Sequence, residues 1–229
     1  MSKTSIKRRR SGRVSKPGDP PGKTKLIAAL RHLLEERDFN SITTAEIANA
    51  AETNEALIYR YFGDKRGLLH RVLAEYLQQM LDRIDAHCES IEDPMEQLEA
   101  FIWETFDIYA KHRVFAKIVL FEARCFQGYF KSEAYQLVRR YAHQFYDTIA
   151  LCIENGEFRS DLPTRQVRDS IIGMIEHLAM HDVISGKTMD PDQYTRTISE
   201  IVLNGLLTRK SSPKKAVKAS EAGKVLALQ

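Results

Sequence analysis

Cysteine is scarce in this chain of 229 residues, and its three cysteines follow no metal-binding or redox pattern. Cys88, Cys125 and Cys152 are widely spaced and contain no CxxC pair. An odd and scattered set argues against a disulfide framework and against a zinc cluster. We expect these side chains to be reduced and mostly buried as small apolar groups.

Long apolar runs are also absent. No stretch approaches the roughly 20 apolar residues that a membrane-spanning helix needs. The basic N-terminus lacks the apolar segment of a signal peptide. The sequence therefore predicts a cytoplasmic protein that has no membrane partner.

Catalytic signatures are missing as well. The chain has no glycine-rich phosphate loop, no GxSxG motif and no Cys/His pair in a recognisable context. His177 and His181 share one face of a predicted helix, with Glu176 adjacent, but no third metal ligand is evident. Polar groups of a pocket or an interface are the favoured interpretation, so we expect no enzyme, no cofactor and no metal. A helical enzyme stays as an alternative that would need a convergent set of titratable groups.

Alternating strand patterns do not occur, whereas apolar residues recur with helical spacing throughout the chain. The predicted fold is therefore all-α. The expected helices cover about 23–37, 43–51, 55–62, 65 to at least 84, 94 to at least 109, 114–127, 131–154, 164–185 and 191–209. Asp64, Asp93 and Asp190 are expected to cap helix starts, Asn155-Gly156 to end one helix as a left-handed C-cap, and Gly186 to close another.

The net charge of +3 hides a strong asymmetry. Residues 1–25 carry a net +8 and residues 210–229 a net +4, which leaves −9 for the residues between them. Composition predicts a disordered basic arm over residues 1–22 and a disordered basic tail over residues 210–229. Two interpretations stay open for each: contact with nucleic acid, or solubilisation alone.

The most informative stretch is TTAEIANAAETNEALIYRYFGDK, residues 43–65. Thr43 and Glu46 form a capping-box pattern that predicts the start of a short helix. Asn54 is a good cap for a second short helix. On that helix Ile58 and Phe62 share a face that should be buried. The opposite face presents Ala56, Leu57 and Arg60, flanked by Tyr59 and Tyr61.

This stretch resembles the DNA-binding domain of the TetR/AcrR family of bacterial transcriptional regulators. The resemblance covers about residues 23–75, and it departs from the family pattern at Glu52 and Thr53, where Gly and Val are usual. Glu52 would then occupy a left-handed turn position at modest cost. The matching residues are Ile47, Ala48, Ala51, Ile58, Tyr59, Tyr61, Phe62, Lys65 and Leu68.

The resemblance implies two domains: an N-terminal three-helix, helix-turn-helix DNA-binding domain over residues 23–76, with the helix-turn-helix at about 43–62, and a larger C-terminal helical ligand-binding and dimerisation domain over residues 77–209. It implies a homodimer that binds a pseudo-palindromic operator in double-stranded DNA, as a repressor, and that a small molecule releases. A helical protein-interaction module with weak, non-specific DNA binding is the alternative.

Residues that could contact DNA combine a guanine-reading arginine, groups for thymine methyls and donors to phosphates. The candidates are Thr43, Thr44, Asn54, Ala56, Leu57, Tyr59, Arg60, Tyr61 and Lys65. The alternative interpretation makes Tyr59 and Tyr61 half-buried core aromatics. Glu55 either accepts from a cytosine amino group or stabilises the helix start.

Aromatic residues gather on the helices of the larger domain, where the resemblance implies an effector site. The candidate pocket residues are Phe101, Phe106, Tyr109, Phe121, Cys125, Tyr141, Phe145, Ile175 and Leu178. Their apolar character favours a hydrophobic or amphipathic effector, and the C-terminal portion is faintly similar to regulators that respond to fatty acyl-CoA. An ordinary packed core is the alternative.

The last two predicted helices are apolar over more than one stripe, so they have more surface to bury than their own domain covers. In the resembled family these helices pair with their copies in a four-helix interface. The candidate interface residues are Ile171, Ile175, Leu178, Ile198, Ile201 and Val202.

Overall fold

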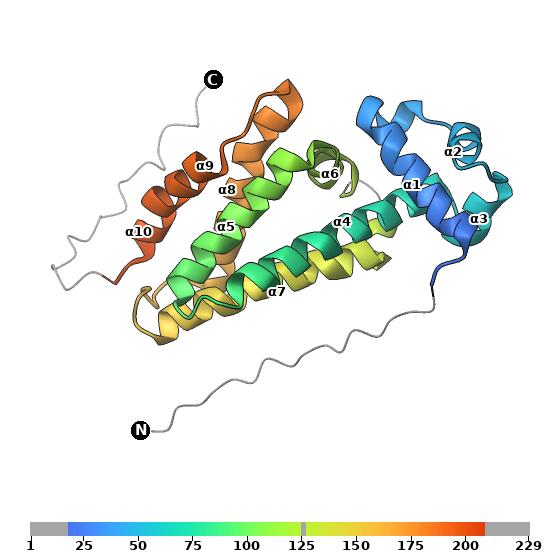
Figure 1. Ribbon diagram of the computed structural model, residues 1–229. Helices are drawn as coiled ribbons and strands as arrows, with labels where there is room; N and C mark the ends of the chain where they lie inside the picture. Colours follow the sequence, from blue (N-terminus) through green and yellow to red (C-terminus); the bar gives the residue numbers. More distant parts are fainter. Residues whose placement is uncertain (1–17, 125–126, 209–229) are drawn as a thin grey trace, which may run out of the picture.

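The computed structural model describes residues 18–124 and 127–208 (Figure 1). These residues form helices without a single strand, and the isolated antiparallel bridge in this part of the chain joins Phe158 to Leu207. The all-α prediction is confirmed. The predicted tail and most of the predicted arm lie outside the described residues. The first helix starts at Pro21, inside the predicted arm, because proline is well suited to the first helical turn.

The N-terminal helices form a small unit at one end of the molecule (Figure 1). It contains α1 (Pro21–Glu36), the 3-10 turn η1 (Phe39–Ser41), α2 (Thr44–Ala50) and α3 (Ala56–Phe62). The long helix α4 (Lys65–Cys88) begins in this unit, where it packs on α1 and α3. It then runs into the larger unit and packs there on α5 and α7, so one continuous helix connects both units.

The larger unit is a bundle whose central helix is α5. This helix packs against α4, α7, α8 and α9. The bundle contains α5 (Pro94–Lys111), α6 (Arg113–Lys117), the π turn η2 (Ile118–Glu122), the 3-10 turn η3 (Gln127–Lys131), α7 (Glu133–Glu154), α8 (Thr164–Ser185), α9 (Pro191–Ile198), the π turn η4 (Ser199–Leu203) and α10 (Asn204–Leu206).

Helix ends follow the capping residues that the sequence indicates. Asp64 accepts the backbone N–H of Gly67 at 2.6 Å, and Asp93 accepts that of Met95 at 2.8 Å. Asp190 caps α9 in the same way. Gly156 and Gly186 have φ angles of 80° and 76°, so both adopt a left-handed conformation, which was predicted for Gly156.

Two helices that were predicted to be continuous α-helices are not. The helix expected over 114–127 divides into α6 and η2, and the helix expected over 191–209 is interrupted by η4 and ends at Leu206. In η2 the N–H of Ala123 bonds to the carbonyl of Ile118, five residues earlier, at 2.9 Å. A π turn places one extra residue in a turn, and apolar spacing alone does not reveal it.

Candidate functional site

The start of α2 is fixed by the predicted capping box, which the structure contains. The Thr43 hydroxyl accepts the N–H of Glu46 at 3.2 Å, and the Thr43 N–H donates to the Glu46 carboxylate at 2.7 Å. Arg37 donates to the same carboxylate at 2.7 Å. The Arg37 hydrogen bond, followed by those from Thr43, lowers the pKa of Glu46 to about 2. Thr43 therefore holds α2 in place.

The turn between α2 and α3 has the backbone strain that the resemblance implied. Glu52 has a φ of 51°, and no other non-glycine residue in the described ranges has a positive φ. The N–H of Thr53 bonds to the carbonyl of Ala48 at 2.9 Å and closes the turn. A left-handed residue with a side chain costs roughly 1–2 kcal/mol, so the surrounding bonds have to hold this turn.

Helix α3 begins one residue later than predicted. Asn54 accepts the N–H of Ala56 at 2.8 Å, which fits its expected capping role. Glu55 accepts the hydroxyl hydrogen of Thr44 at 2.5 Å. This bond joins the first turns of α2 and α3, and it gives Glu55 a structural partner within the protein. Thr44, a predicted DNA contact, uses its hydroxyl for this internal bond.

The two faces of α3 differ strongly in their exposure to solvent. Ile58 is 0% exposed, whereas Tyr59 is 53% exposed. Ala56 and Arg60 are also exposed, and Leu57 and Tyr61 are half-buried. We call Asn54, Ala56, Tyr59 and Arg60 the reading surface, since these four predicted contact residues are exposed together on one short segment.

The aromatic rings of Tyr61 and Phe62 on α3 are both half-buried. Phe62, expected to be buried with Ile58, is only half-buried, because it lines an open cleft beside α1 and α7 together with Tyr61. The start of α1 lies close to α3, since a Cβ added to Gly22 would lie 3.2 Å from Leu57 Cδ1. Leu57 and Tyr61 therefore help to seat α3 on α1.

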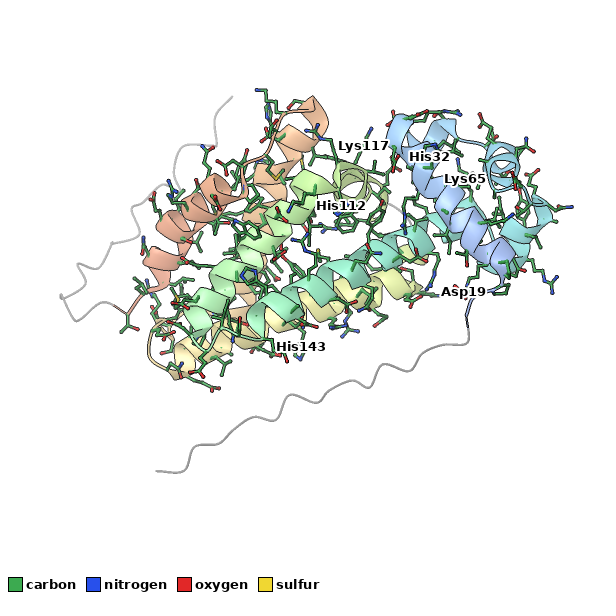
Figure 2. All side chains as sticks on the ribbon, viewed as in Figure 1. Asp19, His32, Lys65, His112, Lys117 and His143 are labelled. Atoms are coloured by element: carbon green, nitrogen blue, oxygen red, sulfur yellow. The ribbon has the colours of Figure 1, made fainter. Side chains whose placement is uncertain are left out.

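Lys65 makes contacts inside the N-terminal unit (Figure 2). Its ammonium donates to the carbonyl oxygens of Phe39 at 2.9 Å and of Ile42 at 2.5 Å. The nitrogen also lies 4.3 Å from the centroid of the Phe39 ring. Burial lowers the pKa of Lys65. The sequence predicted a phosphate contact for this residue, but its donors tie the chain around η1 to the start of α4.

A cavity of about 170 Å³ lies in the bundle between α4, α5, α6, η2, α7 and α8. Most of its wall is apolar. The lining residues are Leu77, Met80, Tyr109, Phe115, Val119, Arg124, Val138, Tyr141, Ala142, Asp169, Ile172 and Glu176. The shape and composition suit a small apolar group next to a few polar ones.

The predicted pocket residues separate into two groups. Tyr109 and Tyr141 line the cavity, whereas Phe101, Phe106, Phe145 and Ile175 are buried in the core without lining it. The rings of Phe101 and Phe145 lie 5.0 Å apart, and Tyr141 lies 5.4 Å from Phe145, so these rings fill the space between themselves. Phe121 and Leu178 are partly buried and also do not line the cavity. Cys125 lies outside the described residues.

Sequence reasoning missed the charged end of the cavity. Arg124 donates from Nη1 to Glu176 Oε2 at 2.8 Å, and its Nη2 donates to the other carboxylate oxygen. The two residues are 52 positions apart, so no local pattern pairs them. The sequence feature that could have indicated this charged end is Glu176, a carboxylate one turn after Ile172 on the side of α8 that lines the cavity.

The wall of the cavity is connected to the N-terminal unit. Phe115 and Val119 line the cavity from α6 and η2. On the same segment Lys117 forms an ion pair with Asp38, and Glu122 lies 3.7 Å from Arg66 of α4. Figure 2 shows Lys117 at the end of the bundle that faces the N-terminal helices. The cavity wall is therefore joined to the N-terminal unit through α6 and η2.

The last two helices bury most of the residues predicted for a dimer interface. Ile171, Ile175 and Ile198 are at most 1% exposed within one subunit, so their assignment to the interface is wrong. They point into the subunit's own core, and Leu178 and Val202 are half-buried. Two isoleucines of this region point outward. Ile201, a predicted interface residue, is 65% exposed, and Ile184, which was not predicted, is 68% exposed.

Two of the three candidate metal ligands on α8, His181 and Glu176, have other partners. His181 lies 3.1 Å from Asp182, and Glu176 is paired with Arg124. Within residues 18–124 and 127–208, no group of three His, Cys, Asp or Glu side chains is arranged to hold a metal ion. The same ranges contain no helix that is long and apolar enough to cross a membrane.

Comparison with known proteins agrees with this architecture. The profile of bacterial regulatory proteins of the tetR family matches residues 26–72, and that of the tetracyclin repressor-like C-terminal domain matches residues 92–206. The regulator BetI of Stenotrophomonas maltophilia is 29% identical over 90 residues, which are 39% of this chain and 46% of that relative's length. BetI of Klebsiella pneumoniae is 24% identical over 176 residues, 75% of this chain and 87% of the relative.

A solved structure extends the likeness to the fold of both units. The transcriptional regulator FadR of Bacillus subtilis, in complex with stearoyl-CoA, superimposes with a TM-score of 0.71 at 20% identity. The match covers 80% of this chain and 98% of that one. The two profile matches lie on the two units that the structure contains, so this chain belongs to the TetR family of bacterial transcriptional regulators.

Proposed function

We propose that this chain is a homodimeric repressor that inserts α3 into the major groove of a pseudo-palindromic operator and is released by a small apolar or amphipathic effector. The exposed reading surface is the observation that supports this proposal most. In this proposal the exposed Arg60 reads a guanine edge, Ala56 contacts a thymine methyl, and Tyr59 and Asn54 reach bases or phosphates.

Rigidity of α3 supports the same proposal. The Thr44–Glu55 bond joins α2 to α3, the capping box fixes the start of α2, and the Lys65 bonds tie the chain before α2 to α4, which follows α3. A reading helix held in this way enters the groove without first losing conformational freedom, which favours affinity. We therefore assign Thr43, Thr44 and Lys65 to the support of α3 and the reading surface to DNA contact.

The effector site of this proposal is the cavity, and its apolar wall supports an effector with an apolar portion. The FadR neighbour holds stearoyl-CoA, so a fatty acyl-CoA is one effector to test. An occupied cavity would displace Phe115 and Val119, and with them the ion pairs of Lys117 and Glu122. The two reading surfaces of a dimer would then no longer match one operator spacing.

The dimer of this proposal forms through α8 and the segment from α9 to α10. Ile184 and Ile201 are large apolar side chains that each expose most of their surface in one subunit. Gly173 of α8 and Gly205 of α10 have open space where a Cβ would stand, so neighbouring helices could approach closely there. A two-fold symmetric pairing of these helices would bury Gly173, Ile184, Ile201 and Gly205 in both subunits.

The test is selection of binding sites from random duplex DNA by the purified full chain, at two salt concentrations. We expect an enriched palindrome whose affinity falls steeply with salt. The double variant Tyr59→Ala/Arg60→Ala should lose the selected site, with unchanged unfolding and oligomeric state. Arg139→Ala removes an exposed cation of α7 as the matched control and should bind normally. Selection of no sequence, or full affinity of the double variant, would contradict the proposal.

A further inference from the structure

The part of the chain that contains the reading surface carries no net charge. Residues 18–72, which include the whole match to the tetR-family profile, contain eight Lys or Arg and eight Asp or Glu. Proteins gain affinity for duplex DNA when their Lys and Arg side chains replace the counterions condensed on its phosphates. A neutral unit gains little from this replacement, so the distribution of its cations decides how much it contributes.

Most of these cations already have partners within the protein. Six of them form ion pairs, and Lys65 donates to two backbone carbonyls. The six pairs are Lys23–Asp19, Lys25–Glu52, Arg31–Glu75, Arg37–Glu46, Arg66–Glu122 and Arg71–Glu133. A paired cation that turned to a phosphate would leave its carboxylate beside the same negative charge. Within the described part of residues 18–72, only Arg60 has neither an ion pair nor a carbonyl partner, and its guanidinium lies 5.9 Å from the centroid of the Tyr61 ring.

The stretch that precedes the described residues has the opposite character. We call residues 1–17 the basic segment, because they contain seven Lys or Arg and neither Asp nor Glu. Four of these cations, Lys7, Arg8, Arg9 and Arg10, are consecutive. Such a run is complementary to a phosphate backbone. Seven cations also lie within the roughly 6–10 phosphate contacts that give a protein a steep salt dependence on DNA.

The described chain begins beside α3. Asp19 forms ion pairs with Lys23 of α1 at 2.9 Å and with Arg71 of α4 at 3.5 Å, so two helices hold the point where the basic segment is attached. A Cβ added to Gly22 would lie 3.2 Å from Leu57 Cδ1, and Figure 1 shows this end of α1 next to α3. Seventeen residues can span at most roughly 60 Å, which exceeds one turn of duplex, roughly 35 Å.

The basic tail is attached at the other end of the molecule. The N–H of Thr208 bonds to the carbonyl of Glu157, just after α7, at 2.8 Å. Figure 1 shows α10, the last helix before the tail, at the end of the bundle away from α1 and α3. Residues 210–229 contain five Lys and one Glu. Removal of the same number of cations from either end therefore separates the effect of position from that of net charge.

From these observations we propose that the basic segment is part of the DNA interface, and that Lys7, Arg8, Arg9 and Arg10 bind backbone phosphates beside the bases that α3 reads. These contacts add affinity and salt dependence but no sequence preference. The inference rests on the proposed function, because it adds a second region of contact to the proposed DNA interface. It also decides between nucleic-acid contact and solubilisation, the two interpretations that the sequence leaves open for this segment.

The affinity of the full-length protein for its selected operator, measured by fluorescence anisotropy over a series of salt concentrations, tests the proposal. Lys7→Gln/Arg8→Gln/Arg9→Gln/Arg10→Gln should bind about tenfold or more weakly at moderate salt. The slope of log affinity against log salt should become shallower by about three to four, because each lost phosphate contact removes about 0.9 from it. Site selection by this variant should return the wild-type sequence, since phosphate contacts carry no base information.

The matched control is Lys210→Gln/Lys214→Gln/Lys215→Gln/Lys218→Gln. It removes four positive charges from the basic tail, so the net charge of the protein changes by the same amount. The affinity and the salt slope of this variant should equal those of the wild type. Both variants should keep the unfolding midpoint and the oligomeric state of the wild type, since neither changes a residue of a described helix.

The contrary outcomes are distinct. An unchanged salt slope in the Lys7–Arg10 variant, beside a wild type that binds its operator, would overturn the inference and leave the proposed function standing. An equal change of slope in both variants would show an effect of net charge and would overturn it too. A different selected sequence would replace the phosphate assignment by base contacts. If the wild type selected no operator, the proposed function would fail, and the same slopes on random duplex DNA would still decide the inference.

Discussion

At the scale of single residues, the polar side chains of the N-terminal unit divide into those bonded within the unit and those that are exposed and that we propose to contact DNA. Hydrogen bonds to neighbouring elements occupy the side chains of Thr44, Glu55 and Lys65. Tyr59 and Arg60 project from a helix that those bonds hold. A residue type that suits DNA is therefore not enough to identify a contact, because the same donors stabilise the unit.

Lys65 gives the clearest residue-scale prediction. Lys65→Met removes two charged hydrogen bonds to carbonyl oxygens, and each such bond contributes about 1.5–3 kcal/mol. We expect the free energy of unfolding to fall by at least about 3 kcal/mol, with weaker operator binding as a consequence of a looser α3. Urea unfolding followed by circular dichroism measures the first effect.

Lys25→Met is the matched control, since this lysine of α1 is exposed and lies 3.6 Å from Glu52. It should change stability little. If Lys65 instead bound a phosphate, Lys65→Met would keep its stability, and the slope of log affinity against log salt would drop by about one. That result would return Lys65 to the set of DNA contacts.

At the scale of elements, α2 owes its start to an ionised carboxylate. The pKa of Glu46 is held at about 2, below its ordinary value of 4.5. A lowered pKa in the folded state means that ionised Glu46 stabilises the fold above about pH 4.5, and that this contribution is lost as the pH falls from there towards 2. The helix start is therefore acid-sensitive.

Glu46→Gln tests that sensitivity. Thermal unfolding midpoints across pH 2–7 should show the variant below the wild type at neutral pH and level with it near pH 2. Glu36→Gln, an exposed change at the end of α1, should follow the wild-type profile. A gap between Glu46→Gln and the wild type that is equally large at pH 2 and pH 7 would contradict the role of the charge.

Elements were predictable from the sequence where a local signal marks them. Asp64, Asp93 and Gly186 fix helix ends through bonds or dihedral angles within a few residues. The π turns were not predictable, because the choice between an α and a π turn depends on packing from outside the segment. The Arg124–Glu176 pair also joins distant segments, so only the folded chain brings it together.

At the scale of the whole molecule, the fold separates a buried and an exposed side on the last two helices. Apolar content indicated that these helices have two faces to bury, but the sequence did not distinguish Ile198, which belongs to the core, from Ile201, which points outward. The structure distinguishes them because η4 shifts the register of the helix between these two residues.

Ile201→Asp tests the dimer. The side chain is 65% exposed in one subunit, so the fold should tolerate the change. An unpaired carboxylate at a buried interface should weaken dimerisation by about a hundredfold or more. Analytical ultracentrifugation at micromolar concentration should then show monomers, and operator affinity should fall with the loss of the second reading surface.

Phe130→Asp serves as the comparison, since Phe130 is 56% exposed but belongs to η3, which packs on α7. It should remain dimeric. Dimers of Ile201→Asp with wild-type stability would place the interface elsewhere.

The π turn η2 gives this segment a tolerance for chain length. It accommodates one extra residue in a single turn, so the residues after it keep nearly the direction that they would have in an α-helix one residue shorter. Deletion of one residue within Ile118–Glu122 is therefore expected to restore an ordinary α turn and to leave Arg124 beside α8. A deletion within an ordinary α-helix such as α5 would instead rotate everything after it by about 100°. The chain should thus tolerate a single-codon deletion in η2 better than the same deletion in α5.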